Sequence, residues 1–304
     1  MTHKRSTTLF CCLLLFCTLS AQTNRGEDHT FYKGRILPAP ETVFKKFTEA
    51  GMNPENHVLT KAEQQKVEQA FSILPPLYKK ILKAHLHSIS FMDNMPNTAL
   101  TSTLETGDTS KQFNISFRAG ILNETISAWA TRKERTVFDT MVNPALSIEI
   151  DAGNFDAIQY VLLHEATHVV DAVLNLTPHA EKADSLMAPT ALTVNVWRLF
   201  NTPVTKFSNP LLEKTRFRGG PVQPISSATE IYKALAKTPF ASLYAMASCY
   251  EDLAELVTIY HLTAKLHQPF VVYVKEHGKV KAAFEPMKNK LVKQRARQLG
   301  FLYR

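Results

Sequence analysis

The sequence predicts an α+β fold, in which a mixed sheet packs on one long apolar helix and a mainly helical part follows. Short segments before residue 151 alternate polar and apolar residues, which is typical of strands with one buried face. A continuous apolar run then extends from Ile158 to Val173, which is the length of a buried helix. The 45% hydrophobic content of the 304 residues is sufficient for a packed core.

The first 21 residues predict a secretory signal peptide. Lys4 and Arg5 precede an uncharged run from Leu9 to Leu19, and small residues follow up to Ala21. The run is shorter than the about 20 apolar residues that a membrane-spanning helix needs. We therefore expect cleavage near Ala21 and a secreted or periplasmic protein.

The cysteine content and the net charge limit the stabilising cross-links and the binding partners that this chain is expected to have. The mature chain would keep only Cys249, so it forms no intrachain disulfide and relies on its core. The net charge falls from +8 to +6 when Lys4 and Arg5 leave, and the excess lies between Lys275 and Arg304. A basic terminal helix could contact an anionic envelope surface weakly, although such a face is more often solvated. Nucleic acid is not expected as a partner, because no nucleic-acid module is recognisable.

After the signal peptide, the chain divides into an N-terminal extension and one domain. Prolines and Gly51 in the extension, residues 22–58, argue against any long regular element there. The domain, residues 59–304, consists of an N-terminal subdomain, 59–175, and a C-terminal subdomain, 176–304. The oligomeric state is left open by the sequence.

Local signals place the elements of the N-terminal subdomain. Thr60 and Glu63 form a capping box that starts a helix, and Pro75-Pro76 ends it. A short helix over Leu77–Ala84 is expected to follow. Asn123 is expected to cap a further helix that extends through Ala130. The charged residues Arg132–Arg135 after it are expected to form a solvated turn. Three strands of one sheet are expected at 87–91, 113–117 and 145–150, of which 113–117 is a candidate edge strand.

The C-terminal subdomain is predicted to contain helices, one hairpin and one long loop. Residues 201–226 carry four prolines and Gly219-Gly220 without a clear period. A structureless loop of this length is uncommon in a compact domain unless it is functional, so we expect a flap over the site. The expected helices are Leu186–Phe200, Thr229–Lys237, Ala247–Leu266 and Pro286–Leu299, and the expected hairpin joins Phe270–Lys275 to Val280–Phe284.

An H-E-x-x-H pentapeptide lies inside the apolar run. His164 and His168 are four residues apart, so on a helix their imidazoles lie on one face and can bind one ion. Glu165 stands where a carboxylate could take a proton from a metal-bound water. The alternative is a buried helix in which two histidines fall four apart by chance.

A catalytic zinc needs a third protein ligand, and the best candidate is Glu251. Glu251 and Glu255 are four residues apart in a segment rich in alanine, leucine and valine, where a buried carboxylate needs a charge partner. Glu255 could accept the free N–H of a ligand imidazole. The alternative is an amphipathic helix whose acidic face meets water.

These motifs resemble a known family. H-E-x-x-H-x-V-D followed by Y-x(6)-E-x-x-A-E resembles the gluzincin zinc metallopeptidases, and most closely the anthrax lethal-factor and Pro-Pro endopeptidase group. The resemblance covers about residues 87–265, although the stretch between the two motifs is longer than expected for that group. The matching residues are His164, Glu165, His168, Val170, Asp171, Tyr244, Glu251, Ala254 and Glu255.

The resemblance implies a zincin-like fold with one zinc ion per chain on His164, His168 and Glu251. It further implies that Glu165 is the general base and that Tyr244 donates a hydrogen bond to the oxyanion of the tetrahedral intermediate. A core aromatic residue is the alternative for Tyr244. The expected function is an exported zinc metalloendopeptidase acting on peptides or proteins. The rival is a catalytically silent exported or envelope-associated binding protein with a structural zinc site.

Other candidate ligands are less favoured. Asp171 shares a face with both histidines, but a straight helix carries its side chain past the ion, so we expect it to support a histidine or form a local cap. Cys249 is expected to be a small packed residue. The remaining histidines, His179, His261 and His267, lack motif spacing and are expected to be surface or satisfied residues.

Overall fold

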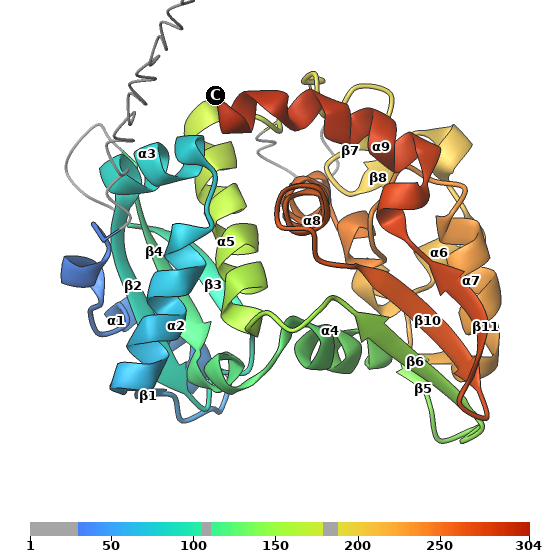
Figure 1. Ribbon diagram of the computed structural model, residues 1–304, viewed down its shortest axis with the longest axis horizontal. Helices are drawn as coiled ribbons and strands as arrows, with labels where there is room; N and C mark the ends of the chain where they lie inside the picture. The colour runs from blue at the N-terminus through green and yellow to red at the C-terminus, as the bar shows by residue number, and fades with distance from the viewer. Residues whose placement is uncertain (1–29, 105–110, 179–187) are drawn as a thin grey trace, which may run out of the picture.

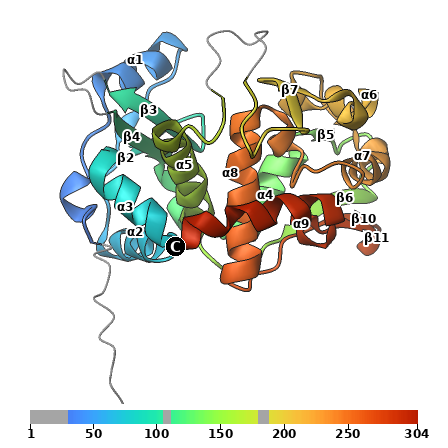
Figure 2. The ribbon, with the colours of Figure 1, turned by 90° about the horizontal axis from the view of Figure 1, so that it is seen from above.

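The computed structural model describes residues 30–104, 111–178 and 188–304. The expected signal peptide and His179 lie outside these ranges. Two helices, α5 (Ala157–Leu174) and α8 (Cys249–Tyr260), lie side by side between two sheets, so the chain is a mixed α+β protein (Figures 1 and 2). No helix within the described residues combines the length and apolar character needed to cross a membrane.

The first sheet is mixed and has the order β1-β2-β4-β3. Strands β2 and β4 are parallel, and the other pairs are antiparallel. The strands predicted at 87–91 and 113–117 are confirmed as β2 and β4. The bounds of the four strands are Glu55–Asn56 (β1), Leu86–Asp93 (β2), Ala99–Leu104 (β3) and Gln112–Arg118 (β4).

The prediction that 113–117 forms a sheet edge is wrong, because β4 lies between β2 and β3. Its polar residues Asn114 and Ser116 are buried and find their partners on the neighbouring strand. The Asn114 side-chain amide donates to Ser88 Oγ at 3.0 Å, and the Ser90 and Ser116 hydroxyls are 2.8 Å apart. The polar alternation at 113–117 therefore belongs to a buried strand. Within the described residues β3 is the edge strand next to β4, and no further strand pairs with its outer side.

The N-terminal extension contains a helix that the sequence analysis did not expect, α1 (Glu41–Glu49). Pro40 and Gly51 flank this helix and do not interrupt it, since Pro40 is its N-cap and Gly51 follows its end with φ +77°. Val43 and Phe47 pack in a separate small cluster with Met92 of β2 and with Met95, which follows that strand. Helix α1 thus covers one face of the sheet (Figure 2).

The other face of the first sheet is covered by α2 (Lys61–Ser72), α3 (Pro76–His85) and α5 (Figure 1). The predicted capping box is confirmed, because Thr60 Oγ1 accepts from the Glu63 backbone N–H at 3.3 Å and the Glu63 carboxylate accepts from the Thr60 N–H at 2.8 Å. The short helix expected at 77–84 is α3.

Helix α4 spans Ile126–Arg135, and two details of its prediction are wrong. Thr125 and not Asn123 is the N-cap, and its side chain accepts from the Ala128 N–H at 3.2 Å. Asn123 ends a preceding 3-10 turn. Residues 132–135 continue the helix and do not form a separate turn, because Glu134 and the apolar side chains before it are buried on one face.

The second sheet is antiparallel and has the order β11-β10-β6. The predicted hairpin is confirmed as β10 (Val271–Glu276) and β11 (Lys279–Phe284). The strand expected at 145–150 is confirmed as β6 (Leu146–Asp151). The prediction that it belongs to the first sheet is wrong, because β6 pairs with β10 in the second sheet. A local pattern carries no information on which distant strand becomes the partner.

Residues 188–227 differ most from expectation. The helix expected over Leu186–Phe200 is absent from its described part, 188–200, where turns lead into a small hairpin. The segment 201–226 is not a loose flap, because Leu212, Thr215 and Ile225 are fully buried. Its short elements are β7 (Trp197–Leu199), β8 (Thr202–Pro203), α6 (Pro210–Glu213), and β9 (Gln223–Pro224), which pairs with β5 (Phe138–Asp139).

The remaining helices agree with the sequence. They are α7 (Ala228–Leu235), α8 with a π-helical turn over His261–Lys265, and α9 (Lys290–Ala296). His261 is a satisfied buried histidine whose ring nitrogens lie 2.8 Å from the Ile73 carbonyl oxygen and 3.0 Å from the Tyr303 hydroxyl. His267 is exposed, and Cys249 is buried as a free cysteine. Short 3-10 helices occur at Lys33–Arg35, Ala119–Asn123, Thr205–Phe207, Arg216–Arg218, Ile225–Ser227, Tyr244–Met246, Pro286–Lys288 and Arg297–Tyr303.

A buried ion pair joins α9 to α8, which it crosses (Figure 2). The two terminal nitrogens of the Arg295 guanidinium donate to the Asp252 carboxylate, at 2.8 and 2.6 Å, and Trp197 Nε1 donates to the same carboxylate at 2.7 Å. Arg295 therefore does not belong to a solvated basic face. The pair fixes α8 one residue after Glu251.

We expect Arg295→Met to destabilise the fold by about 3–5 kcal/mol, because it leaves the Asp252 carboxylate buried without its charge partner. Urea unfolding followed by circular dichroism measures the change. Arg297→Met removes a cation from an exposed position nearby and is expected to change the free energy of unfolding by less than about 0.5 kcal/mol. Equal losses in the two variants would contradict the importance of the buried pair.

Candidate metal centre

Helix α5 carries both histidines of the pentapeptide. It begins at a reciprocal capping box between Asp156 and Gln159, and it ends at Asn175, whose φ of +51° is left-handed. Nearly every side chain between these ends is buried, so α5 is held on most of its circumference. This packing fixes the direction in which His164 and His168 point.

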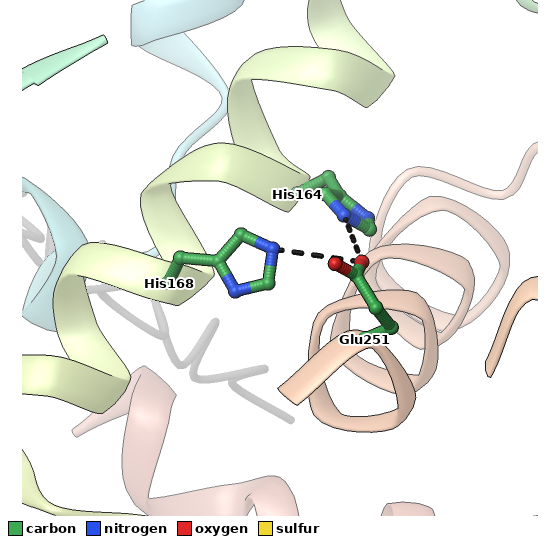
Figure 3. A group of neighbouring side chains, drawn as sticks. All are labelled: His164, His168 and Glu251. Carbon is green, nitrogen blue, oxygen red and sulfur yellow. Dashed lines mark hydrogen bonds and ion pairs between the residues drawn. The ribbon is translucent and has the colours of Figure 1, made fainter. Parts of the chain in front are cut away.

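The structure brings together the three side chains that the sequence predicts as metal ligands. His164 and His168 point from α5 toward Glu251 on α8 (Figure 3). Glu251 Oε2 lies 3.0 Å from His164 Nε2 and 3.6 Å from His168 Nε2. One ligand atom from each residue lies within 4.8 Å of the others, and no further such group of three occurs among the described residues. One oxygen facing two imidazole nitrogens is a donor set that fits a cation such as zinc.

Glu255 lies where the prediction placed it, one turn along α8 from Glu251. Its Oε1 atom is 3.2 Å from His164 Nδ1, so the carboxylate can hold the proton of that nitrogen and leave Nε2 for an ion. Two hydroxyls fix the carboxylate in turn, since Tyr160 Oη donates at 2.9 Å and Ser242 Oγ at 2.6 Å. The buried carboxylate is therefore fully engaged.

The electrostatics of these groups favour positive charge between the two helices. Burial alone would lower the pKa of His164, but hydrogen bonds with Glu251 and Glu255 raise it to about 10. Burial opposes ionisation of Glu255, yet the charge of Lys133 and the His164 hydrogen bond lower its pKa to about 2. The two imidazoles likewise hold the pKa of Glu251 well below its usual range, against the effect of burial. A bound cation would replace the proton that the carboxylates hold on His164.

Glu165 lines the same cleft as the three clustered side chains and is not one of them. Its carboxylate accepts a hydrogen bond from Thr101 Oγ1 at 2.7 Å. Thr101 lies in the edge strand β3, which the sequence analysis did not identify. No local signal marks this contact, because 64 residues separate the two side chains in the sequence.

Tyr244 lies against the same centre. Its ring stacks on that of His164 with 6.0 Å between centroids, and the Phe217 ring meets it edge-on at 5.1 Å. Lys133 Nζ lies 3.5 Å from the centroid of the Tyr244 ring, so this lysine is not the solvated residue that the sequence suggested. Burial and the charges of Glu251 and its neighbours raise the pKa of Tyr244, so the phenol stays protonated and able to donate.

Asp171 is a local cap, one of the two roles expected for it. Its carboxylate accepts from the Thr177 backbone N–H at 2.7 Å and from the Thr177 hydroxyl at 2.5 Å. These bonds close the turn after α5. Asp171 is not in the group of clustered ligand atoms, as expected for a third side chain on the same straight helix.

His164, His168 and Glu251 line a cleft of about 550 Å³. Ala99, Thr101 and Thr103 of strand β3 also line this cleft, as do Tyr244 and Tyr250. None of the residues 201–226 lines it, which again excludes the flap. A larger cavity of about 730 Å³ lies around His57 at the far edge of the same sheet, away from the clustered ligands.

Comparison of the chain with protein-family models, with curated proteins and with solved structures found no match.

A buried carboxyl group near the centre gives a pH-dependent prediction. Glu134 is buried and accepts a hydrogen bond from Tyr232 Oη, and burial raises its pKa to about 7 against the effect of that bond. The unfolded chain ionises this group near pH 4.5, so the folded state loses stability as pH rises from about 4.5 to about 7, and the loss is complete above that pH. We expect the parent to lose on the order of 2 kcal/mol between pH 5 and 8 through this group.

Glu134→Gln keeps an acceptor for Tyr232 and removes the titration, so it should flatten this part of the stability profile. Chemical unfolding at a series of pH values measures it. Glu230→Gln changes an exposed glutamate on α7 and is the matched control. A Glu134→Gln profile as steep as that of the control would contradict the prediction.

Proposed function

We propose that this chain is a zinc-dependent endopeptidase of zincin-like fold that hydrolyses peptide bonds with Glu165 as general base. The observation that carries the proposal is the convergence of His164, His168 and Glu251 from two helices (Figure 3), with Glu165 in the lining of the same cleft. Zinc with three protein ligands leaves a position for water, lowers the pKa of that water and polarises a carbonyl group. Export through the first 21 residues remains part of the proposal and rests on their composition.

Two side chains supply the proton chemistry. The Glu165 carboxylate takes a proton from the attacking water and then delivers it to the nitrogen of the leaving amine. The Tyr244 hydroxyl, which stays protonated, donates a hydrogen bond to the oxyanion that develops on the scissile carbonyl. Lys133 beneath the Tyr244 ring and Phe217 at its edge hold that phenol in place.

The open edge of β3 is the proposed binding place for the substrate, in place of the strand 113–117. An extended peptide adds to such an edge through main-chain hydrogen bonds, which give affinity with little sequence preference. Strand β3 borders the cleft over its length and ends the sheet beside α5. The position of this edge supports a peptide or protein as the substrate class.

The purified mature protein should hold about one zinc ion and cleave members of a diverse peptide library. Mass spectrometry of the digests, with and without a chelator, identifies cleaved bonds and their dependence on metal. His164→Ala is the matched inactive variant, since it removes a ligand at the centre. Tightly held zinc without cleavage of any peptide would favour the silent binding protein and end the proposal.

A further inference from the structure

In strand β3, the backbone N–H and C=O groups of every second residue face away from β4, toward the open edge of the sheet. The Arg118 N–H donates to the Thr98 carbonyl oxygen at 2.9 Å, so the pair Thr98 and Arg118 is a hydrogen-bonded pair of the antiparallel ladder. Hydrogen-bonded and non-bonded pairs alternate along such a ladder. In the register of β3 with β4, Leu100 and Ser102 therefore bond to β4, and the N–H and C=O groups of Ala99, Thr101 and Thr103 face the open edge.

The backbone of Thr101 faces the open edge, and its side chain points toward α5. Successive side chains of a strand point to opposite faces, and Leu100 packs on the α1 side of the sheet while Thr101 reaches Glu165 on the other. Thr101 Oγ1 lies 2.7 Å from Glu165 Oε2 and 3.4 Å from the Glu165 carbonyl oxygen. One residue thus presents its backbone to an incoming peptide and its hydroxyl to the proposed base.

We propose that Thr101 is a positioning residue, which holds the Glu165 carboxylate in register with the strand that receives the substrate. The inference rests on the proposed function. A glutamate side chain can adopt several rotamers, and no other described side chain has a hydrogen bond to the Glu165 carboxylate. The Thr101 hydroxyl selects one orientation of the carboxylate, and because Thr101 belongs to the docking strand, that orientation is set relative to the bound peptide.

Three variants test the inference. Thr101→Val removes the hydroxyl with little change in shape, Thr101→Ser keeps it, and Ser102→Ala removes a hydroxyl on the opposite face of β3. The Ser102 hydroxyl is buried without a hydrogen-bond partner among the described residues, so its loss is a control for altered packing of the strand.

Thr101→Val should lower kcat about 10- to 100-fold, because a misplacement of about 1 Å at a reacting group costs up to about 100-fold. KM should stay within about threefold, since the backbone groups that bind the peptide remain. Thr101→Ser should recover kcat to within about threefold of the parent, and Ser102→Ala should match the parent within about twofold. A Thr101→Val enzyme with parental kcat, or one not rescued by serine, would overturn the inference.

Two measurements without turnover keep the inference separate from the proposed function. Zinc affinity of Thr101→Val, measured against a competing chelator, should equal that of the parent, since no ligand is touched. Crystal structures of parent and Thr101→Val should show the Glu165 carboxylate displaced in the variant by about 1 Å or more. If the Glu165 carboxylate has the same position in both crystal structures, the inference is wrong even when the enzyme is active. A parent that cleaves no peptide defeats the proposed function, while the two crystal structures still decide whether Thr101 positions Glu165.

Discussion

Glu165→Gln is expected to retain one zinc ion and to lose peptidase turnover by about 10²- to 10⁴-fold. The amide cannot accept the proton of the attacking water, so the general base is lost. The ligand set is untouched, because Glu165 does not belong to the clustered group of His164, His168 and Glu251. Glutamine preserves the size of the side chain and a carbonyl oxygen that can accept from Thr101.

Metal content by atomic emission and kcat on one cleaved peptide are measured on the same preparation. The exposed Glu230→Gln variant, in which the same chemical change is made on α7, should be indistinguishable from the parent. Undiminished turnover in Glu165→Gln would remove this residue from the mechanism. Loss of zinc together with turnover would show that the carboxylate is a ligand, contrary to its place in the structure.

Glu251→Ala is expected to abolish zinc binding almost completely, whereas Glu255→Ala and Asp171→Ala lose it only modestly. Glu251 approaches from α8 and faces both imidazoles with one oxygen, at 3.0 and 3.6 Å, so its loss leaves an ion with two ligands. Glu255 holds the far nitrogen of His164, and removal of such a partner typically costs about 10- to 100-fold in affinity. The Asp171 carboxylate accepts hydrogen bonds from Thr177 and has none with the three predicted zinc ligands.

Titration of the three variants with a competing chelator ranks their zinc affinities. The free energy of unfolding of each metal-free variant is measured in parallel, because Asp171→Ala also removes a buried cap. A greater loss of zinc in Asp171→Ala than in Glu251→Ala, with the fold intact, would exclude the assignment of Glu251 as the third ligand.

The elements with strong local signals were predictable. The capping box of Thr60, the apolar run that becomes α5 and the alternating strands of the β10–β11 hairpin all encode their structure within a few residues. Strand β3 was missed because its Thr101 and Thr103 face a cleft and not a core, so the apolar alternation of a half-buried strand is weak. Strand β6 was assigned to the wrong sheet because its partner, β10, lies more than a hundred residues away in the sequence, and no local pattern encodes such a pairing.

The candidate site divides in the same way. His164 and His168 are four residues apart on one helix, so the pentapeptide alone predicted their common face, with Glu165 beside it. Glu251 was predictable because a carboxylate in an apolar helix needs a partner. The contacts of Thr101 and Lys133 depend on how β3 and α4 pack beside the centre, and neither residue stands in a pattern that differs from an ordinary surface segment.

The ion pair between Arg295 and Asp252 also has a consequence for biosynthesis. A ribosome adds residues from the N-terminus, so α5 and α8 are both complete while α9 is still unmade. Until Arg295 emerges, Asp252 has no cation to balance it in the interior, and the segment of α8 that carries Glu251 lacks its clamp. The part of α8 that carries Glu251 is therefore expected to be held in place only after the segment with Arg295 has been made and has packed against α8.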